Sequence, residues 1–242
     1  MRIQPIILAG GKGTRMGNPE LPKVLTPLKG RPIMSYLLDN LAQADFMKPV
    51  LVVGYHQEKV RQEFGDDYTY ILQEEQLGTG HAVEVCREQL EGTADIYIIL
   101  FGDQPLWTKE TMLSLAKEHE QKGVNFSLVT LRSEDPIFYN FGRIIRDNSG
   151  NMVAIREMKD CTEDEMKIHE YNPSMYCCTD NWMWDAIEKI KPNNVQNEYY
   201  LTDLLDISVS EGQKMGWVET QNAQEAMGIN TPEQLEEVAQ YL

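Results

Sequence analysis

Short apolar runs alternate with segments of helical periodicity through the first 131 residues of this chain. Runs rich in β-branched residues predict strands, and apolar residues spaced three and four apart predict helices between them. The predicted strands are residues 3–8, 50–53, 68–72, 96–101 and 124–131. The predicted helices are residues 32–46, 57–64, 78–90 and 108–121, the last with Thr108 as its N-cap. Such alternation is typical of βαβ units with right-handed crossovers, so we expect a mostly parallel sheet flanked by helices.

The pattern changes after Leu131. Residues 142–146 and 152–156 flank the turn sequence Asp147-Asn148-Ser149-Gly150 and predict a hairpin. Further strands are expected at residues 176–179 and 217–220, and further helices at residues 182–190, 200–210 and 232–242, the last capped by Thr231. We therefore predict one α/β domain over residues 1–242, with a half of nucleotide-binding type (1–131) and a more antiparallel half (132–242).

The charge is strongly acidic overall, with 38 Asp and Glu residues against 22 Lys and Arg residues and a formal net charge of −16. Nucleic-acid-binding surfaces need a basic footprint, so this balance argues against a nucleic-acid partner. The first 31 residues are the exception, because six cationic side chains there accompany one acid, Glu20: Arg2, Lys12, Arg15, Lys23, Lys29 and Arg31. This local excess indicates an anion site, and the alternative is a set of scattered solvated charges.

Nothing in the sequence predicts a membrane segment. The longest apolar run is Ile96–Phe101, whereas a membrane-spanning helix needs about 20 apolar residues. The apolar stretch near the N-terminus is too short for the core of a signal peptide. We expect a cytoplasmic protein with four reduced cysteines, of which the adjacent Cys177 and Cys178 point to opposite faces of a strand.

The sequence Leu8-Ala9-Gly10-Gly11-Lys12-Gly13-Thr14-Arg15-Met16 follows the first predicted strand. Glycines after a strand allow a sharp turn and let successive N–H groups approach a phosphate chain. Lys12 and Arg15 add positive charge, and an arginine offers forked donors for phosphate oxygens. The segment matches neither G-x-x-x-x-G-K-[ST] nor G-x-G-x-x-G, and a plain strand-to-helix turn would not need the two cations. We interpret it as a phosphate-binding loop.

Two more loops, residues 73–80 and 102–105, follow predicted strands at the same edge of the sheet. Ligands of open parallel sheets bind at this edge. Lys23, in the sequence Leu21-Pro22-Lys23, is near enough along the chain to reach the same ligand, and Pro22 restricts the backbone before it. The alternative is that Lys23 is an ordinary surface lysine.

Eight short motifs, taken as a set over nearly the whole chain, resemble those of the sugar nucleotidyltransferases. They are L-A-G-G-K-G-T-R-M (8–16), L-P-K (21–23), Q-L-G-T-G-H-A (76–82), F-G-D (101–103), F-G-R (141–143), E-M-K-D (157–160), N-E-Y-Y-L-T-D (197–203) and G-I-N (228–230). The nearest pattern is that of the uridylyltransferase domain of the bacterial bifunctional N-acetylglucosamine-1-phosphate uridylyltransferases. The resemblance implies a Rossmann-like, nucleotide-diphospho-sugar transferase fold with a smaller antiparallel part that binds the sugar.

The resemblance also implies a reaction: Mg²⁺-dependent transfer of a nucleotidyl group from UTP to a hexosamine 1-phosphate such as N-acetylglucosamine 1-phosphate, with release of pyrophosphate. It implies catalytic roles for Arg15 and Lys23, and Mg²⁺ ligation by Asp103 and Asn230. Its implied nucleotide-binding residues are Leu8, Ala9, Gly10, Gly11, Gly13, Gln73, Gly78, Thr79, Gly102 and Asp103. Its implied sugar-binding residues are Gly142, Glu157 and Asn172.

Simpler structural roles are the alternatives for four of these residues. Asp103 suits an Asx turn, Glu157 a solvated hairpin position, Asn172 a turn before Pro173, and Asn230 a helix cap.

Two departures from the family pattern concern the sugar and the further domain. The related enzymes have Asn-Thr-Gly where this chain has Asn172-Pro173-Ser174, so glucosamine-type, glucose and muramic-type 1-phosphates all stay candidates. The bifunctional enzymes continue into a hexapeptide-repeat acetyltransferase domain, whereas this sequence shows no such repeat, so we expect no acetyltransferase activity. The alternative functions are thymidylyl or cytidylyl transfer, and a catalytically silent regulatory or nucleotide-binding protein of the same fold.

Overall fold

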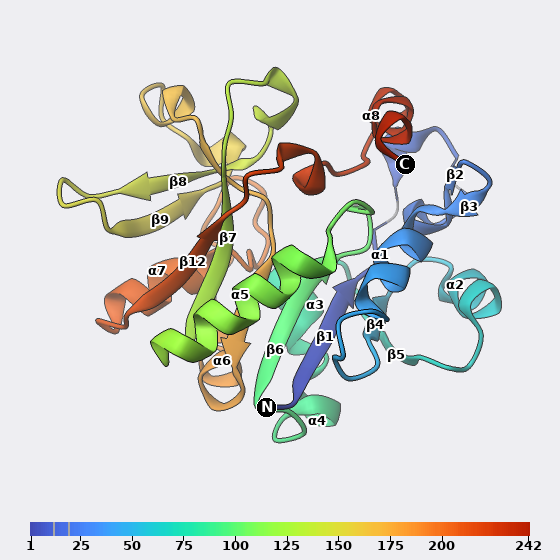
Figure 1. Ribbon diagram of the computed structural model, residues 1–242, viewed down its shortest axis with the longest axis horizontal. Helices are drawn as coiled ribbons and strands as arrows, with labels where there is room; N and C mark the ends of the chain where they lie inside the picture. The colour runs from blue at the N-terminus through green and yellow to red at the C-terminus, as the bar shows by residue number, and fades with distance from the viewer. Residues whose placement is uncertain (12, 19) are drawn as a thin grey trace.

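The computed structural model describes residues 1–11, 13–18 and 20–242, so the predicted loop cation Lys12 lies outside the described residues. Within this part of the chain ten strands form one sheet: β1 (Ile3–Leu8), β4 (Val50–Val53), β5 (Thr69–Leu72), β6 (Ile96–Phe101), β7 (Phe126–Arg132), β8 (Gly142–Arg146), β9 (Met152–Arg156), β10 (Glu170–Asn172), β11 (Tyr176–Thr179) and β12 (Met215–Glu219). Their order is β5-β4-β1-β6-β11-β7-β10-β8-β9, with β12 beside β7 (Figure 1). A small ribbon of β2 (Pro27–Leu28) and β3 (Arg31–Pro32), which was not predicted, stands apart from it.

Strand direction divides the sheet into two regions. The neighbours in β5-β4-β1-β6 are all parallel, as the alternation of strands and helices predicts. Strand β11 is antiparallel to both β6 and β7, and β8 and β9 form the predicted antiparallel hairpin. The prediction of a mostly parallel, helix-flanked sheet with a smaller antiparallel part is therefore confirmed.

Helices cover both faces of the sheet (Figure 1). They are α1 (Ile33–Leu41), α2 (Gln57–Phe64), α3 (Thr79–Glu84), α4 (Arg87–Leu90), α5 (Lys109–Lys122), α6 (Asp180–Ile187), α7 (Asp203–Ser210) and α8 (Pro232–Val238). Apolar residues of α1, α2 and α5 pack in one core cluster, and those of α3, α4, α6 and α7 pack in another. Cys177 belongs to the first cluster and Cys178 to the second, so the adjacent thiols do point to opposite faces.

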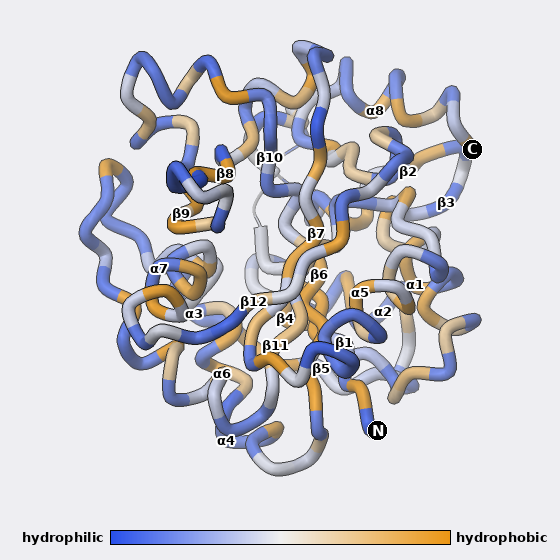
Figure 2. Tube along the Cα trace, turned by 60° about the vertical axis from the view of Figure 1, so that its left-hand side comes forward, coloured by the Kyte–Doolittle hydropathy of each residue, from blue (hydrophilic) through white to orange (hydrophobic). Residues whose placement is uncertain are grey.

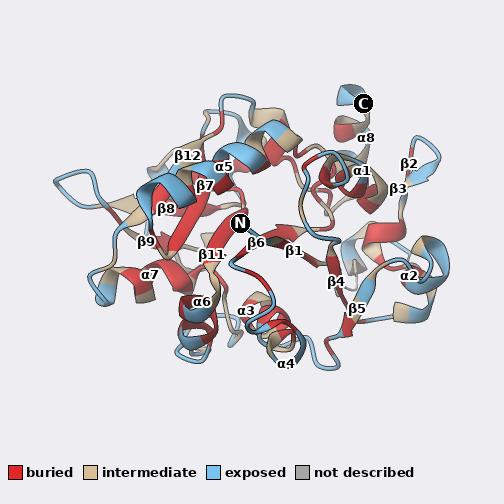
Figure 3. Ribbon diagram, turned by 60° about the horizontal axis from the view of Figure 1, so that its bottom comes forward, coloured by how far each residue is buried: buried red, intermediate tan, exposed pale blue. Residues whose placement is uncertain are grey.

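The central strands are apolar and buried on both faces, whereas the connecting loops are polar (Figures 2 and 3). Among the described residues no helix is both long enough and apolar enough to cross a membrane.

Two predicted helices are shorter than their sequence pattern. The helix predicted over residues 78–90 is two helices, because the Val85 N–H bonds both the His81 and the Val83 carbonyl and tightens the turn where α3 ends. The helix predicted over residues 232–242 ends at Val238 and continues as a 3₁₀ turn. Both predicted caps are confirmed, since Thr108 and Thr231 each accept a hydrogen bond from the backbone N–H three residues later.

Candidate active site

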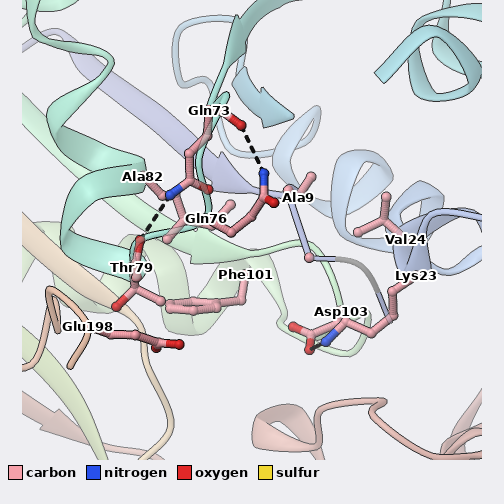
Figure 4. Close-up of a pocket in the computed structure, with 14 residues that line it drawn as sticks. Ala9, Lys23, Val24, Gln73, Gln76, Thr79, Ala82, Phe101, Asp103 and Glu198 are labelled. Atoms are coloured by element: carbon pink, nitrogen blue, oxygen red, sulfur yellow. Dashed lines mark hydrogen bonds and ion pairs between the residues drawn. The ribbon is translucent and has the colours of Figure 1, made fainter. Parts of the chain in front are cut away.

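Three loops at the carboxyl ends of β1, β5 and β6 surround one cavity of about 240 Å³, here called the glycine-loop cavity (Figure 4). This is the edge at which a parallel sheet binds its ligands, beside the point where the strand order reverses between β1 and β6. Nine predicted site residues line it: Leu8, Ala9, Gly10, Gly11, Lys23, Gln73, Gly78, Thr79 and Asp103.

Three predicted residues stand outside the wall of this cavity. Gly13 has a φ of +62°, and a Cβ added to it would lie 2.8 Å from the Cβ of Lys23, so its lack of a side chain lets the loop pass close to Lys23. Gly102 is buried beneath the loop, where an added Cβ would lie 2.9 Å from a methyl group of Val24. Arg15 is exposed beside the cavity.

The base of the loop after β5 is fixed by its own hydrogen bonds. The Gln73 side-chain amide donates to the Gly78 carbonyl at 3.1 Å and lies 3.2 Å from Nδ1 of His81. The Gln76 side-chain amide donates to the Gln73 carbonyl at 3.0 Å, and the Thr79 hydroxyl accepts from the Leu201 N–H at 3.0 Å (Figure 4). Two carboxamides therefore face the cavity from a rigid loop.

Lys23 joins the predicted catalytic and metal-binding residues. Its ammonium group donates to the Asp103 carboxylate and, at 3.0 Å, to Oδ1 of Asn230. Arg15 donates to the same Asn230 oxygen at 3.1 Å. The lysine and aspartate side chains are only 16% and 14% exposed, so this ion pair is poorly screened by solvent. The structure thus brings together all four residues from loops far apart in the sequence.

The side chain of Asn230 does not cap a helix. Thr231 caps α8, and the backbone N–H of Asn230 donates to the Gln234 side chain at 2.7 Å. The Asn230 oxygen is directed instead at the two cationic side chains, Lys23 and Arg15.

A second cavity of about 290 Å³, here called the hairpin cavity, lies between the end of β6 and the β8–β9 hairpin. Six predicted residues line it: Lys23, Asp103, Gly142, Glu157, Asn172 and Asn230. Three residues, Lys23, Phe101 and Asp103, line both cavities. The two cavities therefore meet at the Lys23–Asp103 ion pair.

Two polar residues of the hairpin cavity are withdrawn from solvent. Burial raises the pKa of Glu157 to about 6, opposed by a hydrogen bond from Thr202. Glu157 is half-buried, so it is not the solvated hairpin residue of the alternative interpretation. Asn172 is buried, donates to the Tyr176 hydroxyl at 2.6 Å and accepts from the Ser174 N–H at 3.2 Å. It therefore forms the turn of the alternative interpretation and also lines the cavity.

The N-terminal cations do not gather at one place. Arg2 pairs with Asp95, Arg31 pairs with Asp39, and the Lys29 ammonium donates to the Leu242 carbonyl. Among the described residues of this segment, Arg15 and Lys23 are the cations at the cavities. The excess of positive charge in the first 31 residues is thus only in part an anion site.

Three residues of the glycine-loop cavity were not singled out from the sequence: Gln76, Phe101 and Glu198. All three belong to motifs that carried the family resemblance, so their positions within those motifs were the available signal. Figure 4 shows the Glu198 carboxylate beside Phe101 and Thr79, away from Lys23.

The donor atoms at the junction fit a small hard cation. The Asp103 carboxylate and the Asn230 amide oxygen both contact one positive group, the Lys23 ammonium, so the two oxygens converge on one point. Mg²⁺ takes few protein oxygens and completes its shell with water and phosphate oxygens. Elsewhere in the described part of the chain, no three His, Cys, Asp or Glu side chains are grouped to hold a metal.

The MobA-like NTP transferase domain family matches residues 5–176, which is more than half of the chain. The chain belongs to this family. It is 40% identical over 225 residues to the bifunctional protein GlmU of Enterococcus faecalis, covering 93% of this chain and 48% of the relative. It is 41% identical over 242 residues to the bifunctional protein GlmU of Pelotomaculum thermopropionicum, covering 100% and 52%. The chain thus spans about half the length of these curated relatives, and the family predicted from the motifs is confirmed.

Solved structures support the same fold. A UDP-glucose pyrophosphorylase complexed with UDP-glucose superposes with a TM-score of 0.80 at 14% identity, covering 100% of this chain and 98% of that one. A putative glucose-1-phosphate thymidylyltransferase from Bacillus anthracis superposes with a TM-score of 0.77 at 21% identity, covering 99% and 94%. At these identities the similarity shows the fold.

Proposed function

We propose that the chain transfers a uridylyl group from UTP to a hexosamine 1-phosphate such as N-acetylglucosamine 1-phosphate and releases pyrophosphate. The observation that carries the proposal is the junction of the two cavities at Lys23 and Asp103. A reaction between two bound molecules needs two adjacent sites with the reacting groups between them. The 40% identity to a bifunctional protein GlmU supports the same assignment.

The nucleotide occupies the glycine-loop cavity in this proposal. Gly10 and Gly11 bring backbone to the phosphates, and the carboxamides of Gln73 and Gln76 offer the donors and acceptors that a uracil edge requires. Sugar 1-phosphate occupies the hairpin cavity, where Glu157 and Asn172 supply polar groups for sugar hydroxyls. Both phosphate groups then lie near Lys23.

The chemistry is one in-line displacement. An oxygen of the sugar phosphate forms a bond to the α-phosphorus of UTP, and the bond from that phosphorus to the bridging oxygen of the β-phosphate breaks. The attacking oxygen is already anionic, so no general base is needed. Lys23 and Arg15 hold the phosphates and stabilise the negative charge that develops on the departing pyrophosphate.

Mg²⁺ is part of the proposal, with Asp103 and Asn230 as its two protein ligands. When bound there it would neutralise phosphate charge at the junction of the cavities.

A matrix of nucleoside triphosphates against sugar 1-phosphates tests the proposal, with pyrophosphate release measured with and without Mg²⁺. We expect the highest kcat/KM for UTP with N-acetylglucosamine 1-phosphate, and none without the metal. Preference for dTTP or CTP would overturn the donor assignment. Binding of UTP with no turnover for any sugar phosphate would indicate a nucleotide-binding protein instead.

A further inference from the structure

We propose that Lys23 is a displaceable internal counter-ion: it holds the two metal-donor oxygens until a nucleoside triphosphate draws its ammonium away. A divalent cation then binds Asp103 and Asn230 tightly only together with the triphosphate. The inference rests on the proposed function for the identity of the two donors. It goes beyond that function because it sets the order in which metal and nucleotide bind.

The Lys23 ammonium engages both donors at once. It contacts the Asp103 carboxylate and lies 3.0 Å from Oδ1 of Asn230, and no other described residue forms a hydrogen bond or ion pair with that carboxylate. The Asn230 oxygen also accepts from Arg15 at 3.1 Å. A cation that takes both oxygens must therefore displace one ammonium group and lie close to a guanidinium group.

The charges explain why the metal alone is disfavoured. One carboxylate, Asp103, faces two cations, Lys23 and Arg15, so these side chains carry a net charge of +1 where they meet. A divalent cation added to them is repelled, and the low exposure of Lys23 and Asp103 limits the screening. A triphosphate supplies about four negative charges near neutral pH and reverses the sign of the site.

Lys23 has a second position available without a change of fold. Its side chain lines both cavities, so a rotation of its torsions moves the ammonium from Asp103 towards phosphate oxygens in the glycine-loop cavity. The backbone around it is fixed by the close approach of Gly13, whose added Cβ would lie 2.8 Å from the Lys23 Cβ. The exchange of partners is thus confined to one flexible side chain.

The test measures Mn²⁺ binding, used as a probe for Mg²⁺, by electron paramagnetic resonance of the free ion. Wild-type chain is titrated without nucleotide and with a non-hydrolysable UTP analogue. The same titrations are made on Lys23→Met, which keeps the aliphatic stem and removes the charge. Lys29→Met is the matched control, because Lys29 contacts the carbonyl of Leu242 and lines neither cavity. Thermal unfolding verifies that each variant is folded.

We expect Mn²⁺ to bind wild type and Lys29→Met weakly without nucleotide, and at least about tenfold more tightly with the analogue. Lys23→Met should bind Mn²⁺ at least about tenfold more tightly than wild type without nucleotide, and Asp103→Asn added to it should remove the gain. Equal affinity of wild type with and without the analogue would overturn the proposal, and so would equal affinity of wild type and folded Lys23→Met. These measurements need no turnover, so a failure of the proposed reaction would be seen separately.

Discussion

Gly78 and Tyr199 are in such close contact that no side chain fits between them. A Cβ added to Gly78 would lie 2.5 Å from the Tyr199 carbonyl oxygen and 2.7 Å from its nitrogen, and Gly78 has a φ of +120°. The Tyr199 backbone also accepts from the Gly80 N–H and donates to the Leu77 carbonyl. The C-terminal part of the chain therefore fixes the loop that carries the two carboxamides of the glycine-loop cavity.

Gly78→Ala tests this contact. We expect it to lower the free energy of unfolding by more than about 2 kcal/mol, because the positive φ and the backbone clash add. It should also raise the KM for UTP, since Gln73 donates to the Gly78 carbonyl. Gly92→Ala is the control, with a φ of +77° and open space around it, and should cost only about 1 kcal/mol. Equal losses for the two variants in urea unfolding would contradict the close contact.

The sequence predicted the architecture because apolar periodicity reflects which face of each element is buried. It could not predict contacts that depend on the approach of distant backbones. The glycine at position 78 was predicted to touch nucleotide, whereas its lack of a side chain is required by Tyr199. The strand β10 was missed because it has three residues, two of them the polar but buried Glu170 and Asn172.

The site shows the same division. Loops that follow parallel strands must lie at one edge of the sheet, so the meeting of Gln73 and Asp103 around one cavity follows from topology. That Asn230 would reach Lys23 from more than 200 residues away follows from the family motifs and from no local pattern. The count of N-terminal cations misled, because Arg2, Lys29 and Arg31 each have partners elsewhere.

Asp103→Asn tests the role of the carboxylate at the junction of the cavities. We expect kcat to fall at least about 100-fold with saturating Mg²⁺, because the amide cannot supply the negative charge that a hard cation requires. Asp45→Asn is a suitable control, since Asp45 is exposed and its φ of +50° is one that asparagine tolerates. Near-normal turnover of Asp103→Asn would refute the metal assignment.

Glu157 gives a pH dependence of stability. Burial raises its pKa from 4.5 to about 6, so the folded state binds more protons than the unfolded state between these values. Stability is therefore lost as pH rises through this range, by up to about 2 kcal/mol. Glu157→Gln should gain stability relative to wild type from pH 4 to pH 7. Exposed Glu120→Gln on α5 is the control, and unfolding curves of Glu157→Gln that run parallel to wild type at every pH would exclude the effect.

His119 gives the opposite dependence. It is buried, Nδ1 lies 2.9 Å from the Ser127 hydroxyl, and burial lowers its pKa from 6.5 to about 4. The unfolded state binds more protons between these values, so stability falls as pH drops below about 6.5, by up to about 3 kcal/mol. His119→Gln should flatten that fall in chemical unfolding, whereas His169→Gln, at a side chain 38% exposed, should leave it unchanged. An equally steep fall in His119→Gln would show that other groups cause it.

The fate of the α-phosphorus of UTP tests the central claim most directly. The chain is incubated with UTP labelled at this phosphorus, N-acetylglucosamine 1-phosphate and Mg²⁺, and the products are separated. If the two substrates react where the two cavities meet at Lys23 and Asp103, the label appears in the nucleotide sugar, with one unlabelled pyrophosphate formed for each molecule of product. Label that stays in UTP, or that appears in UMP without any nucleotide sugar, would contradict the account.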